Sequence, residues 1–464
     1  QALHAASVLG LRFPRAALAA MMGGAACAPD RLVDAGLLEV DASEIVFVHA
    51  LMREAVYGSL LKSRRRELHA QAAAWYAGRD PVLRAGHLAE AGDPGAARAC
   101  IEAAVAEAES LRLDRAVEFA SRAGMLAREP MDLCLARSLL GELQTRTGHT
   151  HDAIATLREV IDLRPDALME ARARLALANA LRILDRYDEA LASLDRAQAV
   201  LAGHDRPELL ARIWSLRGNI HFPRGELEDC LVAHERALAH ARDAGSPVDE
   251  ARAFGGVGDA LYQRGRMRSA RDHFEKCVQE ARAHGAVGLA LSNAPMLALT
   301  RAICGEASRG LAECAAIAEE AARFGDPRSE VLTRLIEAMI SLYRADYERA
   351  RQTCDRGLAL ARHLGARRFE AELMALQGHA IGELGGTADA QVLLQHAAAL
   401  ALEVARTYCG PWCLGVQALH LPNEERAREL LAQGEALLAG GCVSHNHLEY
   451  RRVAIEFALR HGDC

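Results

Sequence analysis

The chain has 464 residues, of which 51% are hydrophobic and 4% aromatic, and its 55 Lys and Arg against 62 Asp and Glu give a net charge of −7. Few aromatic and β-branched residues stand together, which argues against an all-β or large α/β fold. The acidic balance argues against nucleic acid as a partner, because no basic run extends beyond Arg64–Arg66. We find no apolar run approaching the roughly 18 residues that cross a bilayer, and the 12 cysteines form no CxxC pair. We therefore expect a cytoplasmic protein that binds no membrane.

Residues 1–77 differ in pattern from the rest of the chain. Their hydrophobic spacing predicts a series of short helices and a single strand. The helices are expected over 2–9, 15–22, 30–35, 49–60 and 64–75, and the strand over 45–48. That order is typical of a small winged-helix bundle. Gly and Pro cluster over residues 78–81, between two long helical patterns, and predict a domain boundary there.

From residue 82 onward the pattern is helical. Residues 82–130 read as irregular entry repeats, and residues 131–464 as a regular array with a period of about 40. Two series of small residues, 12 positions apart, recur with this period: Ala178, Gly218, Gly258, Ala298, Ala338 and Gly378, then Ala190, Cys230, Ala270, Gly310, Ala350 and Ala390. Such a spacing, with Gly225, Gly265, Gly305 and Gly385 between the two series, predicts two antiparallel helices that cross closely. A third series, Gly245, Gly285, Gly325 and Gly365, is typical of helix C-termini.

The repeat unit resembles the tetratricopeptide repeat (TPR). Trp214 and Phe254 lie four residues before Gly218 and Gly258, and Phe274 lies four residues after Ala270, as in that family. The resemblance implies an all-α fold: a right-handed solenoid of helical hairpins, preceded here by the winged-helix bundle. The period exceeds the common 34 residues, which predicts longer helices or turns.

The segment Phe47–His69 resembles the module that follows the nucleotide-binding core in signal-transduction ATPases with numerous domains (STAND ATPases). Its portion Tyr57–Arg65, together with residues 218–225 and 441–448, is similar to bacterial class III adenylate/guanylate cyclases that carry an ATPase core and C-terminal TPRs. The resemblance implies that the chain is the C-terminal part of a longer bacterial protein, truncated at both ends. ATP or ADP would then bind in an upstream core, which would also be a partner of the first module.

His49 matches the winged-helix histidine that contacts the β-phosphate of ADP in these ATPases. The resemblance therefore implies that His49 senses the nucleotide state. The alternative is that this imidazole only caps or packs at a strand-to-helix junction. Related motifs place an acid after the histidine, whereas Ala50 follows it here.

Catalytic motifs are absent from the sequence. There is no G-x-x-x-x-G-K-[ST] loop, no G-x-S-x-G elbow and no H-E-x-x-H helix, so we expect no enzyme activity and no cofactor in this chain. Two weak candidates for zinc ligands are the pair His445 and His447 and the pair Cys409 and Cys413. Their spacing does not match that of zinc sites, and we expect no metal.

A polar pattern follows the 40-residue period on one predicted helix face. It comprises Arg172, Arg212 and Arg252, each followed seven residues later by Asn179, Asn219 and Asp259. Residues seven apart share a helical face, and in TPRs this register lines the concave groove. These six side chains could hold a peptide or an acidic ligand, or they could form an ordinary solvated face.

The sequence thus favours a non-catalytic regulatory module. In this hypothesis the winged helix senses the nucleotide state of the upstream core, and the groove binds a protein, peptide or other ligand. Two other hypotheses remain: a passive protein-interaction scaffold, or the same module taken from a transcriptional regulator.

Overall fold

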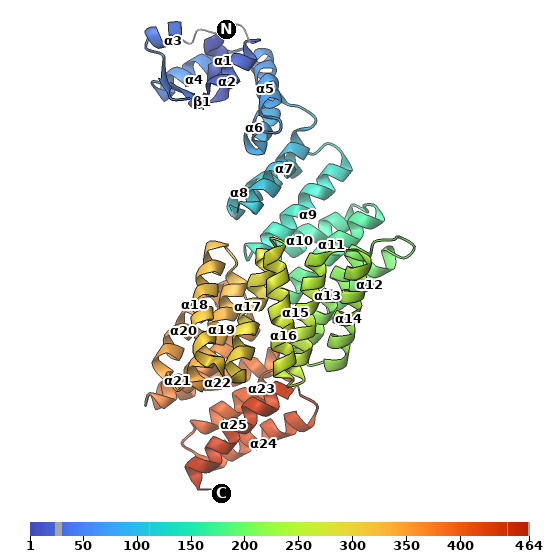
Figure 1. Ribbon diagram of the computed structural model, residues 1–464, viewed down its shortest axis with the longest axis vertical. Coiled ribbons are helices and arrows are strands. Elements are labelled where there is room, and N and C mark those ends of the chain that lie inside the picture. Colours follow the sequence, from blue (N-terminus) through green and yellow to red (C-terminus); the bar gives the residue numbers. More distant parts are fainter. Residues whose placement is uncertain (24–29, 111, 443, 463–464) are drawn as a thin grey trace. The chain divides into compact units, whose positions relative to one another are not determined.

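The structure is a computed structural model that describes residues 1–23, 30–110, 112–442 and 444–462. It divides into two compact units (Figure 1). The first comprises residues 1–147 and 162–165, and the second residues 148–161 and 166–464. Val443, within one of the stretches that resemble the cyclases, lies outside the described residues.

The N-terminal part of the first unit combines short helices with a small sheet. Its elements are α1 (Ala2–Leu9), β1 (Arg12–Pro14), α2 (Arg15–Met21), α3 (Asp30–Asp34), β2 (Leu38–Asp41), β3 (Glu44–Phe47), α4 (Ala50–Ser59) and α5 (Lys62–Tyr76). The strands pair antiparallel in the order β1-β3-β2, with Arg12 opposite Val46 and Leu38 opposite Phe47. The core beneath them contains Phe13, Leu18, Leu38, Ile45 and Leu68.

The helices and β3 form where the sequence predicts them, whereas β1 and β2 were not predicted. Strand β1 has only three residues and ends at Pro14. Strand β2 buries only Leu38 and exposes its other three residues, so neither strand shows the apolar alternation that marks a strand in a sequence.

The first unit continues with α6 (Pro81–Ala91), α7 (Ala96–Glu109), α8 (Leu113–Leu126) and α9 (Pro130–Arg146). Asp80 caps α6 by accepting a hydrogen bond from the Leu83 amide. Helices α5 and α6 pack closely around the turn at 78–80. The Tyr76 ring stacks on His87, and Nδ1 of His87 lies 2.9 Å from Nδ1 of His69. The predicted domain boundary falls in this turn and stays a prediction.

The second unit is an array of antiparallel helices. They are α10 (Thr150–Asp162), α11 (Ala167–Ile183), α12 (Tyr187–Val200), α13 (Pro207–Arg224), α14 (Leu227–Asp243), α15 (Pro247–Gln263), α16 (Met267–Ala283), α17 (Val287–Arg301), α18 (Ala307–Arg323), α19 (Pro327–Tyr343), α20 (Tyr347–His363), α21 (Arg367–Glu383), α22 (Thr387–Val404), α23 (Gly410–Leu419), α24 (Glu424–Ala439) and α25 (Ser444–His461). Successive helices pack pairwise from α11 to α24, which confirms the predicted solenoid of helical hairpins (Figure 1).

The small-residue series lies where the paired helices cross. A Cβ atom on Gly218 would lie 2.4 Å from the His234 ring, and one on Gly378 would lie 2.6 Å from Leu394. The crossings therefore leave no room for a side chain at these positions. The series from Gly245 to Gly365 has φ between +58° and +72°, the left-handed conformation expected after a helix C-terminus.

One helical stretch, Val287–Arg323, is long and apolar enough to cross a membrane by length and composition alone. It was not expected from the sequence, because Arg301 interrupts its apolar run. The stretch is not a single straight helix: a π-helical segment, η1 (Ala302–Glu306), contains Gly305 with φ 104°, and α17 and α18 pack against each other. Just over half of its most apolar window is buried inside the protein.

Candidate functional site

His49 lies at the junction between β3 and α4. It occupies the N-cap position of α4 with extended backbone angles, and its side chain makes no capping hydrogen bond to the helix. Its side chain is exposed, and so is that of Ala50. Leu51, the next residue, is 77% exposed. The structure thus places the imidazole on the surface of the first unit, where it neither caps α4 nor packs in the core.

The arginines of the predicted groove pattern have a partner that the sequence analysis missed. Asp249, which is 2% exposed at the start of α15, has Nε of Arg212 and Nε of Arg252 each 3.4 Å from its Oδ1. Its other carboxylate oxygen accepts a hydrogen bond from the Ser246 hydroxyl at 2.9 Å. Two of the repeated arginines therefore neutralise a buried carboxylate that joins α13 to α15. Arg172 is exposed, and Leu209 stands one period before Asp249.

The second half of that pattern lies deeper. Asn179 and Asn219 are partly buried, and Asn179 Oδ1 accepts a hydrogen bond from Arg182 Nη2 at 3.0 Å. Burial raises the pKa of Asp259 to about 7, although its side chain is still partly accessible. Phe222 and Tyr262, three residues after Asn219 and Asp259, pack in one apolar cluster with residues of α19. The Phe222 ring also lies against Tyr408, and the Tyr262 ring lies against His445 of α25. This face of α11, α13 and α15 is called the inner surface below.

Segments far apart in the sequence meet at the inner surface. Leu184, at the end of α11, packs against Gly365 at the turn before α21. The ring of Phe222 on α13 lies 5.5 Å from that of Tyr408, and the Thr407 hydroxyl donates to the carbonyl of Arg224 at 3.2 Å. The array therefore closes on itself within the second unit.

Three arginines converge on this surface from three helices: Arg182 on α11, Arg328 on α19 and Arg368 on α21. The Arg368 guanidinium pairs with Glu372 at 2.9 Å and lies over the rings of Phe369 and Tyr408 at 4.2 and 4.8 Å. Arg328 lies over the same Phe369 ring at 5.4 Å. We call these three residues the arginine cluster.

Electrostatics at the arginine cluster are unfavourable for Arg182 and Arg328. Burial, followed by repulsion from Arg328, lowers the pKa of Arg182 to about 9, and the Arg182 Nε has no hydrogen-bond partner. Burial, followed by repulsion from Arg368, also lowers the pKa of Arg328. Among the described residues no carboxylate pairs with the Arg328 guanidinium. The carboxylates of Asp185 and Asp326 attract this guanidinium. Asp185 also accepts a hydrogen bond from Tyr187 at 2.6 Å, and Asp326 accepts one from the Ser329 hydroxyl at 2.7 Å.

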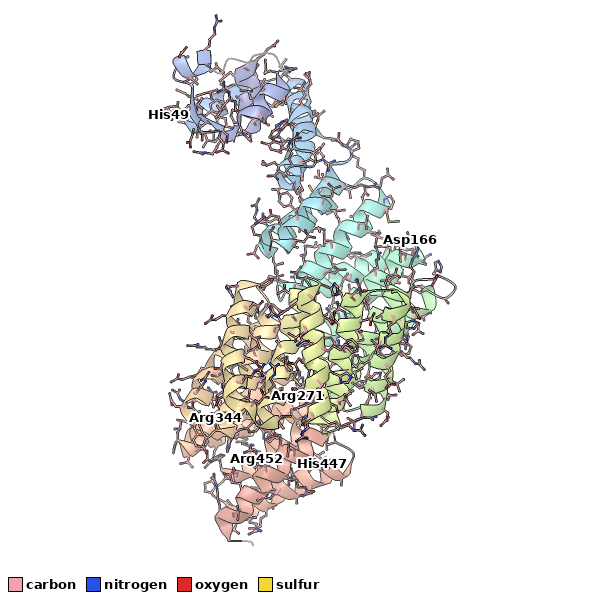
Figure 2. All side chains as sticks on the ribbon, in the orientation of Figure 1. His49, Asp166, Arg271, Arg344, His447 and Arg452 are labelled. Carbon is pink, nitrogen blue, oxygen red and sulfur yellow. The ribbon has the colours of Figure 1, made fainter. Side chains whose placement is uncertain are left out.

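The other end of the inner surface is covered by the chain's own C-terminal helix. His445 on α25 stacks on Tyr262 at 5.3 Å, and Glu449 accepts a hydrogen bond from the Tyr343 hydroxyl at 2.5 Å. Asn446 donates to the carbonyl of Thr407 at 3.1 Å. Figure 2 places Arg452 and His447 on the same helix. Aromatic and polar side chains of α25 thus cover this end of the inner surface.

Among the described residues, the weak zinc candidates of the sequence analysis do not converge as one group of metal ligands, although the side chains of Cys409 and Cys413 share a hydrogen bond. Burial lowers the pKa of His445 to about 4. Its ring stacks on Tyr262 and meets the Tyr408 ring in a T-shaped contact, while His447 is exposed. Among the described residues, a different group converges: His379, Glu383 and His420, whose ligand atoms lie within 4.8 Å of one another. The sequence signal that was missed is His379-x-x-x-Glu383, a spacing that puts both side chains on one helix face.

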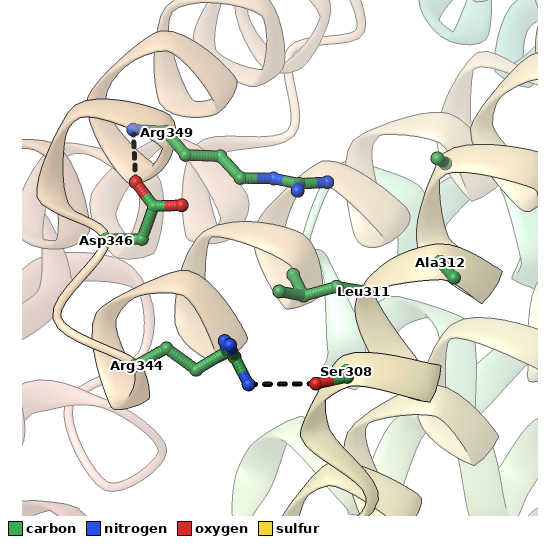
Figure 3. A pocket seen from close by; sticks show the side chains of 7 residues that line it. Ser308, Leu311, Ala312, Arg344, Asp346 and Arg349 are labelled. Carbon is green, nitrogen blue, oxygen red and sulfur yellow. Dashed lines mark hydrogen bonds between the residues drawn. The ribbon is translucent and has the colours of Figure 1, made fainter.

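An open pocket of about 310 Å³ lies at the surface between α18 and the start of α20. Arg344 donates to the Ser308 hydroxyl at 3.0 Å, and the Arg349 amide donates to Asp346 at 3.3 Å (Figure 3). Leu311 and Ala312 line its apolar part. The Arg349 side chain also pairs with Glu337 at 2.8 Å.

Comparisons with known proteins agree with the solenoid. A family model described as tetratricopeptide repeat matches residues 209–283, which correspond to α13–α16. The comparison with curated proteins finds no match. Among solved structures, the chain is similar to the Rap conjugation gene regulator of the plasmid pLS20 in complex with the Phr* peptide, with a TM-score of 0.51 and 12% identity over 74% of this chain and 95% of that one. This similarity shows a shared fold.

Two further structures are similar at lower scores. A STAND protein with a tetratricopeptide repeat sensor from Pyrococcus horikoshii aligns with 99% of this chain at 13% identity and a TM-score of 0.48. The chain spans 64% of the length of that protein. A Rap protein complexed with competence and sporulation factor aligns with 74% of this chain and 99% of its own length, at 10% identity and a TM-score of 0.49.

Proposed function

We propose that this chain is a non-catalytic sensor module whose second unit binds an extended acidic peptide or protein segment along its inner surface. The TPR-type solenoid supports an interaction role, because stacked hairpins present a continuous face built from many short helices. The side chains on that face are charged and aromatic rather than purely apolar, as expected of a ligand-binding surface.

The arginine cluster is the observation that carries this proposal. Three guanidinium groups are brought together, and among the described residues only that of Arg368 has an ion-pair partner, Glu372. Buried charges are costly unless they are paired. An acidic side chain or a C-terminal carboxylate of the ligand would supply the missing charge through charge-assisted hydrogen bonds. A peptide ligand is consistent with the shared fold of the Rap regulator, whose structure contains the Phr* peptide.

Helix α25 gives this site a way to respond. Because His445, Asn446 and Glu449 occupy part of the inner surface, a long ligand has to displace them or bind beside them. A ligand that binds better to the displaced state shifts the population toward it, with a coupling of about 1–3 kcal/mol for typical allosteric proteins.

The test is binding of fluorescently labelled dodecapeptides, one set rich in Asp and Glu and a matched set with Asn and Gln, measured by polarisation. We expect the acidic set to bind and Arg328→Gln to weaken its binding at least tenfold. Arg344→Gln, at the open surface pocket, is the matched control and should leave the affinity unchanged. Equal binding of both sets, or no loss in Arg328→Gln, would exclude the proposed site, and absence of any binding would favour a passive scaffold.

For the first unit we propose a winged-helix role in sensing nucleotide, with His49 contacting ADP held by an ATPase core of a longer, cyclase-linked protein. The exposed imidazole supports this proposal, since it is available to donate a hydrogen bond to a phosphate oxygen. In a protein that carries such a core, His49→Ala should weaken ADP binding by about 1.5–3 kcal/mol in calorimetry. Unchanged ADP affinity would make the first unit a structural spacer.

A further inference from the structure

A second cluster of chemically active side chains lies at the junction of α21 and the end of α23. His379 and Glu383 are one turn apart on α21, and His420 directly follows α23. The two histidines are 4% and 7% exposed. Nδ1 of His379 lies 2.8 Å from Nε2 of His420, and that nitrogen lies 3.6 Å from Oε1 of Glu383.

Helix α21 has a gap in its surface where the His420 ring lies. A Cβ atom on Gly382 would be 2.3 Å from Nδ1 of His420 and 2.5 Å from its Cε1. Only a residue without a side chain lets the imidazole approach the helix this closely. Gly382 therefore holds open the space that brings His420 to the other two side chains.

The separations suit a shared metal ion, since all three ligand atoms lie within 4.8 Å of one another. Two ligands about 2.1 Å from a tetrahedral Zn²⁺ are about 3.4 Å apart, and the observed distances of 2.8 and 3.6 Å lie on either side of that value. Two imidazole nitrogens and one carboxylate oxygen are a donor set for Zn²⁺ and similar transition-metal ions, whereas Mg²⁺ and Ca²⁺ prefer oxygen.

We propose that His379, Glu383 and His420 bind one Zn²⁺ or a similar first-row divalent cation, with a water molecule completing the coordination. In the present state the two imidazoles share a hydrogen bond, in which one nitrogen carries the proton. Binding requires that this imidazole carry its proton on its other ring nitrogen, so that both nitrogens facing Glu383 offer lone pairs. The site is independent of the proposed peptide-binding function.

Arg460 on α25 sets the affinity. It donates to Glu383 and to Glu456, each at 2.5 Å. Glu456 can keep this arginine when the Glu383 carboxylate turns to the metal ion. The positive charge of Arg460 still opposes a dication, so we expect micromolar rather than picomolar binding.

A second group, His221, Glu226 and Asp229, provides an internal control. Its ligand atoms also converge, but Arg224 is bound to Glu226 at 2.7 Å and Asp229 is exposed. Exposed acidic groups commonly gather without a metal, and the Glu226 carboxylate already pairs with Arg224 and lies within hydrogen-bond distance of His221.

The experiment is calorimetric titration of the metal-free chain with Zn²⁺, repeated with Co²⁺ to record its visible absorption. We expect one equivalent to bind and the absorption to be that of a four-coordinate site. Glu383→Gln keeps the shape of the side chain and should weaken binding at least tenfold, whereas the control His221→Ala should not change it. Arg460→Met removes the opposing charge but no ligand, and should tighten binding severalfold.

Three outcomes would overturn the site: no saturable binding of either metal, equal affinity in wild type and Glu383→Gln, or loss of binding in His221→Ala alone. Circular dichroism of each variant checks that it is folded. Because Arg460→Met is expected to change the affinity in the opposite direction from Glu383→Gln, a general loss of structure cannot produce both results.

Discussion

Two groups of arginines in the second unit have the same chemistry and opposite surroundings. Arg212 and Arg252 belong to the 40-residue repeat and share the buried carboxylate of Asp249. Arg182 lies on the inner surface and Arg328 meets it from α19. No carboxylate of the described residues pairs with either guanidinium. Paired charges at a repeated position explain how adjacent hairpins hold together. Unpaired charges on the inner surface require another explanation, and the acidic ligand that we propose would supply it.

Carboxylates show the same contrast within one helix. Asp249 and Asp259 are both on α15, ten residues apart. Asp249 has two arginines and the Ser246 hydroxyl around it, whereas burial alone raises the pKa of Asp259 to about 7. The inner surface is therefore a place where charges of both signs lack their usual partners, although it is assembled from the same repeats.

The largest effect is expected from Glu372→Gln in the arginine cluster. Among the described residues it removes the one carboxylate that pairs directly with buried Arg368, and breaking such a pair costs about 3–5 kcal/mol. Chemical denaturation followed by circular dichroism measures the loss. The control is Glu403→Gln on α22, which breaks an exposed pair with Arg367, the neighbour of Arg368 on α21. Loss of this exposed pair should cost at most about 1 kcal/mol. Similar losses in the two variants would contradict the distinction between buried and exposed pairs.

A smaller and pH-dependent effect is expected at Asp259. Its pKa in the folded chain, about 7, lies above the ordinary value of 3.8, so folding favours its protonated form. The stabilisation is full below about pH 4 and is lost as the pH rises through 7. Because the side chain is partly accessible, we expect about 1–2 kcal/mol between pH 5 and pH 8.

Asp259→Asn tests this directly, since the amide does not titrate. The difference in unfolding free energy between the variant and the wild type should grow in favour of the variant from pH 5 to pH 8. Taking this difference removes the contributions of buried histidines such as His234 and His445, which titrate in both proteins. A difference that does not change with pH would show that Asp259 is ionised throughout and has a partner.

The periodic features of the sequence predicted the fold, because each repeat makes the same local contacts. Gly218 and Gly378 could be recognised as crossing positions, since the close approach recurs every 40 residues. The groove pattern was recognised for the same reason, but its interpretation was incomplete. Asp249 is not repeated, with Leu209 and Leu289 one period away on either side, so its pairing with Arg212 and Arg252 left no periodic signal.

The inner surface could not be predicted from the period. Arg182 and Arg328 occupy different positions in their repeats and meet only because the array closes on itself, which depends on small angles summed over many hairpins. Only two of the three proposed metal ligands could have been recognised in the sequence. His379 and Glu383 have the spacing of a shared helix face, whereas His420 reaches them from the next hairpin through the gap at Gly382.

The smallest stability change separates the two groups of arginines most clearly. Arg328→Met keeps the aliphatic stem against Phe369 but removes the unpaired charge, so we expect a gain of about 1 kcal/mol in unfolding free energy together with loss of acidic-peptide binding. Arg252→Met, which removes one of the two partners of buried Asp249, should instead destabilise by about 1 kcal/mol. Thermal unfolding of both variants measures the two signs. Destabilisation by Arg328→Met would show that this guanidinium is satisfied within the protein itself, and the inner surface would then have no charge left to offer a ligand.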